Sequence, residues 1–144
     1  MLFRSPVDRD GLLKLADLED ALTDQTAVVS LMWANNETGV IFPVKEVSEA
    51  CRSRGVLFHC DAVQAAGKVK IDVRTTSVDY LSLTGHKFHA PKGIGALYVR
   101  RKTPFVPLIY GGHQERRGHR PQDERPRRIH APAAWLARHG KGFA

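Results

Sequence analysis

Short apolar runs alternate with segments of helical periodicity along the first 100 residues of the chain, and few folds accommodate such an alternation. The runs cover residues 28–33, 56–60, 79–84 and 95–100. An almost unbroken apolar run of this length suits a strand that is buried on both faces, as in a parallel sheet covered by helices. Strands that alternate with helices form βαβ units with right-handed crossovers. The sequence therefore predicts an α/β fold with a mostly parallel sheet and covering helices.

Two segments between these runs have the spacing of amphipathic helices. The first covers residues 12–23, and the second begins after Pro43 and stops before Gly55. Apolar residues recur in both segments at intervals of three or four positions, which places them on one face of a helix. The residues near this spacing are Leu13, Leu15, Leu18, Ala21 and Leu22 in the first segment and Val44, Val47, Ala50 and Cys51 in the second.

Length and composition exclude several classes of protein. The chain has 144 residues, of which 42% are hydrophobic and 26% are charged, as in an ordinary globular domain. No apolar run approaches the roughly 18 to 20 residues that span a bilayer, and no signal peptide is recognisable, so we expect a cytoplasmic protein without a membrane partner. Cys51 and Cys60 fit neither a disulfide framework, a redox pair nor a zinc site, and we interpret both as free core thiols.

The positive charge is concentrated in the C-terminal part of the sequence. The formal net charge is +7, and residues 111–144 carry eight basic against three acidic side chains. The composition changes at Gly111-Gly112, which divides the chain into residues 1–112 and a basic tail rich in Arg, His and Pro, residues 113–144. We expect most of the tail to be disordered, with a short helix at 133–138. Its arginines are the basis of a non-enzymatic alternative, nonspecific binding of nucleic acid, although no nucleic-acid motif accompanies them.

Polar residues follow the predicted strands at their carboxyl ends. Asn36 follows the first strand, Asp61 closes the second, and Thr84, His86 and Lys87 end or follow the third. Because the carboxyl ends of parallel strands meet at one edge of a sheet, we expect these side chains to converge on one crevice.

Each of these residues has a chemical and a purely structural interpretation. A lysine at position 87, desolvated at a strand end, could form a Schiff base, whereas Lys92 is expected to lie in a turn. The Asp61 carboxylate could pair with a cationic ring nitrogen, or it could cap a helix that begins at residues 62–64. Thr84 and His86 are donors in a loop that contains glycine, as an anion site requires, but both types are common in ordinary loops.

The combination of motifs is more specific than any one residue. Four segments carry it: residues 32–39 (Met-Trp-Ala-Asn-Asn-Glu-Thr-Gly), 58–64 (Phe-His-Cys-Asp-Ala-Val-Gln), 82–87 (Ser-Leu-Thr-Gly-His-Lys) and 111–116 (Gly-Gly-His-Gln-Glu-Arg). With them, residues 28–115 closely resemble cysteine desulfurases of the NifS and IscS kind, which are class V, fold-type I pyridoxal-phosphate enzymes. The chain resembles an internal fragment of the large domain of these enzymes.

The resemblance implies a cofactor, a reaction and a role for each motif residue. The cofactor is pyridoxal 5'-phosphate, held covalently by Lys87, which also moves protons at the substrate's α-carbon. Asp61 would pair with the ring nitrogen, Gln64 would contact the phenolic oxygen, and Asn36 would lie beside the ring and the substrate. Thr84 and His86 would bind the phosphate. The family converts L-cysteine to L-alanine, passes the sulfur to an enzyme thiol as a persulfide, forms homodimers, and delivers sulfur to an acceptor or scaffold protein for iron–sulfur clusters.

The sequence departs from the family pattern in three places. A phosphate-binding loop and a ring-stacking histidine that precede this region in the family have no counterpart here, and neither cysteine matches the sulfur-accepting one. After Glu115-Arg116 the family continues with a loop containing Gly and Thr, but residues 117–144 contain no threonine, which suggests a shifted reading frame that resequencing of the DNA would test. We expect a marginally stable piece that does not turn over substrate alone. Within the enzyme class, a selenocysteine lyase or another class V enzyme is the alternative.

Overall fold

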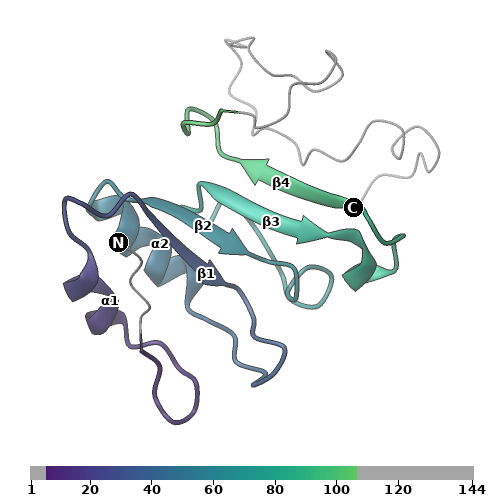
Figure 1. Ribbon diagram of the computed structural model, residues 1–144, viewed down its shortest axis with the longest axis horizontal. Coiled ribbons are helices and arrows are strands. Elements are labelled where there is room, and N and C mark those ends of the chain that lie inside the picture. Colours follow the sequence, from purple (N-terminus) through teal and green to yellow (C-terminus); the bar gives the residue numbers. More distant parts are fainter. Residues whose placement is uncertain (1–5, 107–144) are drawn as a thin grey trace.

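The fold of residues 6–106 is described by a computed structural model. Helices and strands alternate as predicted as far as β2, but no helix separates β2 from β3 in this part of the chain (Figure 1). The elements are α1 (Leu15–Ala21), β1 (Val28–Met32), α2 (Val44–Ser53), β2 (Leu57–Asp61), β3 (Tyr80–Thr84), the 3-10 helix η1 (Gly85–Phe88) and β4 (Gly95–Val99).

The strands form a sheet in the order β1-β2-β3-β4. β1, β2 and β3 run parallel, and β4 runs antiparallel to β3, as the arrows in Figure 1 show. Residues 85–94, which join β3 to β4, are too few for the crossover of a dozen or more residues that a parallel neighbour requires. The prediction of an α/β fold with a mostly parallel sheet is therefore confirmed.

Helix α2 ends where the sequence predicts, and its backbone explains the sharp stop. Gly55 adopts a left-handed conformation with a φ of 68°. The amide of Gly55 donates to the carbonyl of Arg52 at 3.1 Å, and the amide of Val56 donates to that of Cys51 at 2.9 Å. These two bonds form a Schellman motif, which satisfies carbonyls that the end of a helix would otherwise leave without partners. The chain is thereby turned directly into β2.

The hydrophobic core lies between α2 and one face of the sheet, and α1 packs against α2. Phe58 and Cys60 of β2 and Val47 of α2 are fully buried, and Leu81 of β3 is almost so. Burying a side chain such as Phe or Val stabilises the fold by about 1.5–3 kcal/mol relative to leaving it exposed. Cys51 and Cys60 are both buried free thiols, as the sequence predicted.

The opposite face of the sheet is more exposed than the sequence predicted. Val28 of β1 is 51% exposed, Ser30 is exposed, and Leu57 and His59 of β2 are only half-buried. The expectation that the strand at 28–33 is buried on both faces is therefore wrong for residues 6–106. The physical reason is that β1 lies at the edge of the sheet and α2 covers only the other face.

Helix α1 is shorter at both ends than the predicted helix over residues 12–23. Leu13 forms a β-bridge with Val7, and the carboxylate of Asp8 accepts the amide of Leu12 at 2.8 Å. At the other end, the hydroxyl of Thr26 accepts the amide of Thr23 at 3.0 Å. These local bonds offer the backbone an alternative to the helix. Among residues 6–106, no helix is long and apolar enough to cross a membrane.

A half-buried arginine fixes the segment that leads into β3. The guanidinium of Arg100 donates to the carbonyls of Val78 at 2.7 Å, Val73 at 2.9 Å and Thr76 at 2.6 Å. Next to this cluster, the carboxylate of Asp79 accepts the amide of Phe58 in β2 at 2.9 Å. One cation thus satisfies three backbone carbonyls in a stretch without regular secondary structure. This arrangement fixes where β3 begins and therefore where its carboxyl end lies.

Candidate functional site

The carboxyl ends of β1, β2 and β3 are tied together by backbone hydrogen bonds. The amide of Trp33, just after β1, donates to the carbonyl of Asp61 at 2.8 Å. The amide of Ala62, just after β2, donates to the carbonyl of Ser82 in β3 at 3.0 Å. Segments that are far apart in the sequence therefore meet at one edge of the sheet, as expected for parallel strands.

Asp61 is the last residue of β2, and its side chain is half-buried. Its Oδ1 accepts the amide of Val63 at 2.9 Å. Residues 63–68 form hydrogen-bonded turns and not an α-helix, so the carboxylate caps a turn. No donor within residues 6–106 bonds its Oδ2. One oxygen thus caps a turn where the sequence predicted a helix, and the other remains open to a second partner.

The turn after Asp61 lies against the short helix that carries Lys87. A Cβ placed on Gly67 would lie 3.3 Å from the Cβ of Phe88 in η1. Gln64 lies within this turn and is half-buried. The turn that contains Gln64 and the helix that contains Lys87 are therefore neighbours, although more than 20 residues separate these two side chains in the sequence.

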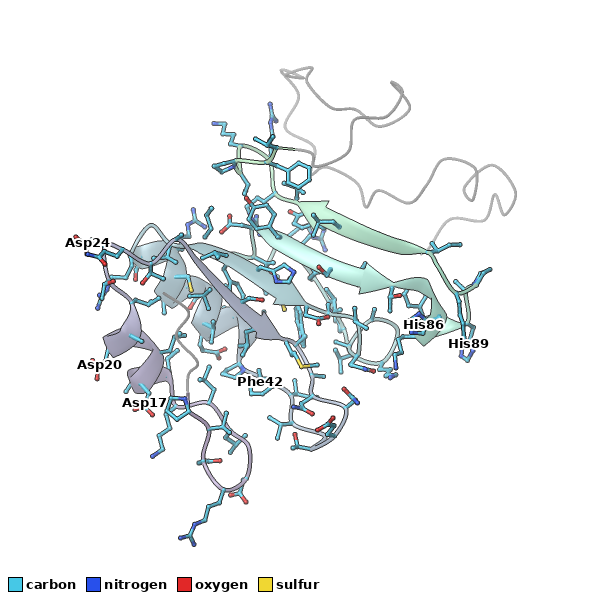
Figure 2. All side chains as sticks on the ribbon, in the orientation of Figure 1. Asp17, Asp20, Asp24, Phe42, His86 and His89 are labelled. Carbon is cyan, nitrogen blue, oxygen red and sulfur yellow. The ribbon has the colours of Figure 1, made fainter. Side chains whose placement is uncertain are left out.

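Thr84 and His86 are joined at the end of β3. The hydroxyl of Thr84 and the Nδ1 of His86 lie 3.0 Å apart, within hydrogen-bond distance. Thr84 is half-buried and His86 is exposed. Figure 2 shows His86 just beyond the arrowhead of β3, at the same edge of the sheet as the turn after β2. A hydroxyl and an imidazole are thus paired at the position where the sequence placed an anion site.

Lys87 is exposed, and the expectation that burial desolvates its amine is wrong for residues 6–106. The physical reason is that η1 projects beyond the end of β3, so its basic side chains reach water. The ion pair shown within the described part of the chain joins Arg74 to Asp72, at 2.7 Å, and does not involve Lys87. The amine of Lys87 is therefore accessible to a reactant.

Asn36 lies in the loop after β1 and is exposed. The loop is held by the side chain of its neighbour Asn35, which was not among the predicted site residues. The Oδ1 of Asn35 accepts the amides of Glu37 at 2.8 Å and Thr38 at 3.2 Å. Because Asn35 forms the turn, the side chain of Asn36 is not needed for it. Because asparagine commonly forms turns, the pair Asn35-Asn36 in the sequence already indicated that one of the two holds the loop.

Neither cysteine has the environment of a nucleophile. Burial raises the pKa of the Cys51 thiol to about 11, and the charge of Asp79 acts in the same direction. Burial, with a smaller contribution from the charge of Asp61, raises the pKa of the Cys60 thiol to about 12. At neutral pH both groups are thiols and not the reactive thiolates. In the part of the chain that the structure describes, no group of three or more His, Cys, Asp or Glu side chains could hold a metal ion.

Several predicted features lie outside the described residues. They are the composition boundary at Gly111-Gly112, the motif at residues 111–116, the basic tail at 113–144 with its arginines, and the short helix at 133–138.

Comparison with known proteins gives consistent matches over most of the chain. The sequence profile of the class-V aminotransferases matches residues 2–136. A cysteine desulfurase from Enterobacter agglomerans is 56% identical over 116 residues, which are 81% of this chain. The same alignment covers 29% of the relative, so the chain spans less than a third of the length of that protein.

Solved structures support the same grouping. A NifS-like protein superimposes with a TM-score of 0.73 at 46% identity, over 78% of this chain and 31% of that protein. A structure described as SspA in complex with cysteine superimposes with a TM-score of 0.71 at 38% identity, over 78% of this chain and 33% of that protein. The sheet and helices of residues 6–106 therefore correspond to one part of a NifS-like fold.

Proposed function

Because the chain belongs to the class-V aminotransferase family, we propose that residues 6–106 provide much of a pyridoxal-phosphate site of the cysteine desulfurase type. The observation that carries the proposal is the presence of three kinds of group at one edge of the sheet. An accessible amine, a carboxylate with one open oxygen, and a paired hydroxyl and imidazole come from adjacent elements. Pyridoxal phosphate presents an aldehyde, a ring nitrogen and a phosphate, which are suitable partners for these three groups.

Each residue of the site has a proposed part in holding this cofactor. Lys87 would hold the aldehyde carbon, and Asp61 would accept a hydrogen bond from the protonated ring nitrogen through its open oxygen. Thr84 and His86 bind the phosphate. Gln64, in the turn against η1, contacts the phenolic oxygen, and Asn36 lies beside the ring and the substrate. A carboxylate in this place stabilises the protonated ring, which is the better electron sink.

The proposed reaction is the conversion of L-cysteine to L-alanine. When bound, the cofactor withdraws electrons from the substrate's α-carbon. Lys87 would take the proton from that carbon and return it. The bond between the β-carbon and the sulfur would break as the sulfur bonds to an acceptor thiolate to form a persulfide, and the β-carbon would gain the proton that completes the methyl group of alanine. Cys51 and Cys60 are unsuited to that role because they are buried and have raised pKa values. The acceptor thiol must therefore come from outside this sequence. The cysteine in the SspA structure supports this class of substrate.

Trapping of the lysine adduct tests the assignment of Lys87. The 144-residue chain is incubated with pyridoxal phosphate, reduced with borohydride and digested, and the modified peptide is identified by mass spectrometry. We expect the adduct on Lys87, together with a visible absorbance that is lost in Lys87→Ala. Lys92→Ala is the matched control, because Lys92 is also exposed and follows in the same connection between β3 and β4. Equal labelling of Lys87 and Lys92, or an unchanged spectrum of Lys87→Ala, would contradict the proposal.

A further inference from the structure

A single histidine ring bridges three strands on the open face of the sheet. His59 lies in the middle of β2 and pairs in register with Ser30 of β1. Its Nδ1 lies 2.8 Å from the hydroxyl of Ser30, and its Nε2 lies 2.8 Å from the hydroxyl of Ser82 in β3. Both ring nitrogens therefore have partners, and the ring has one fixed orientation.

This bridge is next to Asp61. Residues two apart in a strand share a face, so the side chains of His59 and Asp61 lie on the same side of β2. Ser82, which holds the Nε2 of His59, is also the register partner of Asp61 in β3. The carboxylate that ends the strand is thus flanked by groups that His59 holds in place.

The surroundings of His59 favour an uncharged ring. Burial lowers the pKa of its imidazole, and the negative charge of Asp61 opposes this effect only in part. The other titratable side chain on this face of the neighbouring strands is the Tyr80 phenol, which pairs in register with His59, while β1 has no titratable residue. At neutral pH the ring is therefore neutral, and Asp61 is the charge to which it is coupled.

We propose that His59 is a positioning residue for Asp61, a neutral bridge that ties the middles of β1, β2 and β3 together two residues before the carboxylate and leaves its charge available to a cationic ring nitrogen. This inference rests on the proposed function, since it takes Asp61 as the partner of the cofactor ring. An imidazolium in the place of His59 would compete for the carboxylate and repel a protonated ring. The bridge therefore favours binding of the cofactor only while His59 is uncharged.

Two substitutions separate the effect of the hydrogen bonds of His59 from the effect of its charge. His59→Leu removes both hydrogen bonds, whereas His59→Gln keeps a donor and an acceptor on a side chain that never carries a charge. We expect His59→Leu to weaken binding of pyridoxal phosphate about tenfold. We expect His59→Gln to bind pyridoxal phosphate with an affinity within about threefold of that of the unmodified chain. In the unmodified chain the affinity should fall as the pH is lowered through the titration of the imidazole, and in His59→Gln this fall should be absent. Equal affinities and equal pH profiles for all three proteins would overturn the proposal.

A control variant distinguishes positioning from general stability. Ser48 is fully buried in α2, and its hydroxyl accepts the amide of Ser77, away from the carboxyl edge. Ser48→Ala is expected to lower stability without changing the pH profile of binding. If Ser48→Ala reproduced the profile of His59→Leu, the effect at His59 would be structural, and the proposal would fail.

A measurement without cofactor keeps this inference separate from the proposed function. The imidazole resonances of His59 are followed by NMR during a pH titration of the full chain and of its Asp61→Asn variant. Because the charge of Asp61 raises the pKa of His59, we expect a lower titration midpoint in the variant. Identical midpoints would overturn the coupling, whether or not the chain binds the cofactor. A lower midpoint in a chain that forms no adduct at Lys87 would reject the proposed function and retain the coupling of His59 to Asp61.

Discussion

Gly85 and Ala90 meet at the base of the loop that carries His86 and Lys87. A Cβ placed on Gly85 would lie 2.9 Å from the Cβ of Ala90, closer than real Cβ atoms approach. The amide of Ala90 donates to the carbonyl of Gly85 at 3.0 Å, so the backbone there cannot easily move apart. The space between the two positions therefore holds one methyl group.

The effect of moving that methyl group from position 90 to position 85 can be predicted. Gly85→Ala should destabilise the chain by about 1–3 kcal/mol through overpacking. The double variant Gly85→Ala/Ala90→Gly should recover most of the loss, because it moves the methyl group without adding one. Urea unfolding of the chain and the two variants measures both effects. A single variant as stable as the original chain would show that the contact is not tight.

That the predicted site residues lie at one edge of the sheet could be predicted from the sequence, but their environments could not. Asp61, Thr84 and Lys87 end or follow apolar runs, and parallel strands bring such positions to one edge. The exposure of Lys87 depends on the direction in which η1 leaves β3, which no local pattern encodes. The bridge of His59 depends on the register of three strands, so its two serine partners are recognisable only once the sheet is known.

At the scale of elements, the segment before β3 depends on one side chain. Arg100 donates to three backbone carbonyls, and an apolar residue there would leave them without these donors. We expect Arg100→Met to destabilise the chain by about 3 kcal/mol, and Arg100→Lys to recover only part of this, because an ammonium lacks the planar fork of the guanidinium. Chemical denaturation compares the variants.

Arg74→Met provides the matched control for Arg100. The side chain of Arg74 is 80% exposed and pairs with Asp72 at the surface. Water and salt screen such surface pairs, so they contribute little to stability and this variant should remain close to the original chain. If Arg100→Met were no more destabilising than Arg74→Met, the carbonyl cluster would not be what fixes the start of β3.

The elements themselves were largely predictable from periodicity, and their limits were set by local polar contacts. Helix α2 lies where its apolar positions and Gly55 indicate, because pattern and terminator agree. Helix α1 is shorter than its pattern because the carboxylate of Asp8 and the bridge of Leu13 take the residues before it. The antiparallel direction of β4 follows from the length of residues 85–94, a constraint that was present in the sequence.

At the scale of the whole molecule, the edge strand β1 combines an exposed Val28 with backbone groups on its outer side that no strand within residues 6–106 pairs. Such edges favour association with other strands. We expect the purified chain to self-associate and to lack a sharp, reversible two-state thermal transition, and we expect Val28→Lys to reduce association without loss of secondary structure. Sedimentation velocity and circular dichroism measure these properties. A monomeric chain that unfolds reversibly in one step would contradict the prediction.

The bridge of Ser30, His59 and Ser82 has a consequence for whatever layer comes to lie over the open face. A neutral imidazole has one hydrogen to give, so one serine donates to the ring and the other receives from it. The receiving serine keeps its own hydroxyl hydrogen, and within residues 6–106 no acceptor takes it. A purely apolar layer over this face would bury that hydroxyl hydrogen without an acceptor, which costs about 1–3 kcal/mol. A surface that covers this face therefore needs one oxygen that accepts a hydrogen bond from the receiving serine, and the rest of that surface can be apolar.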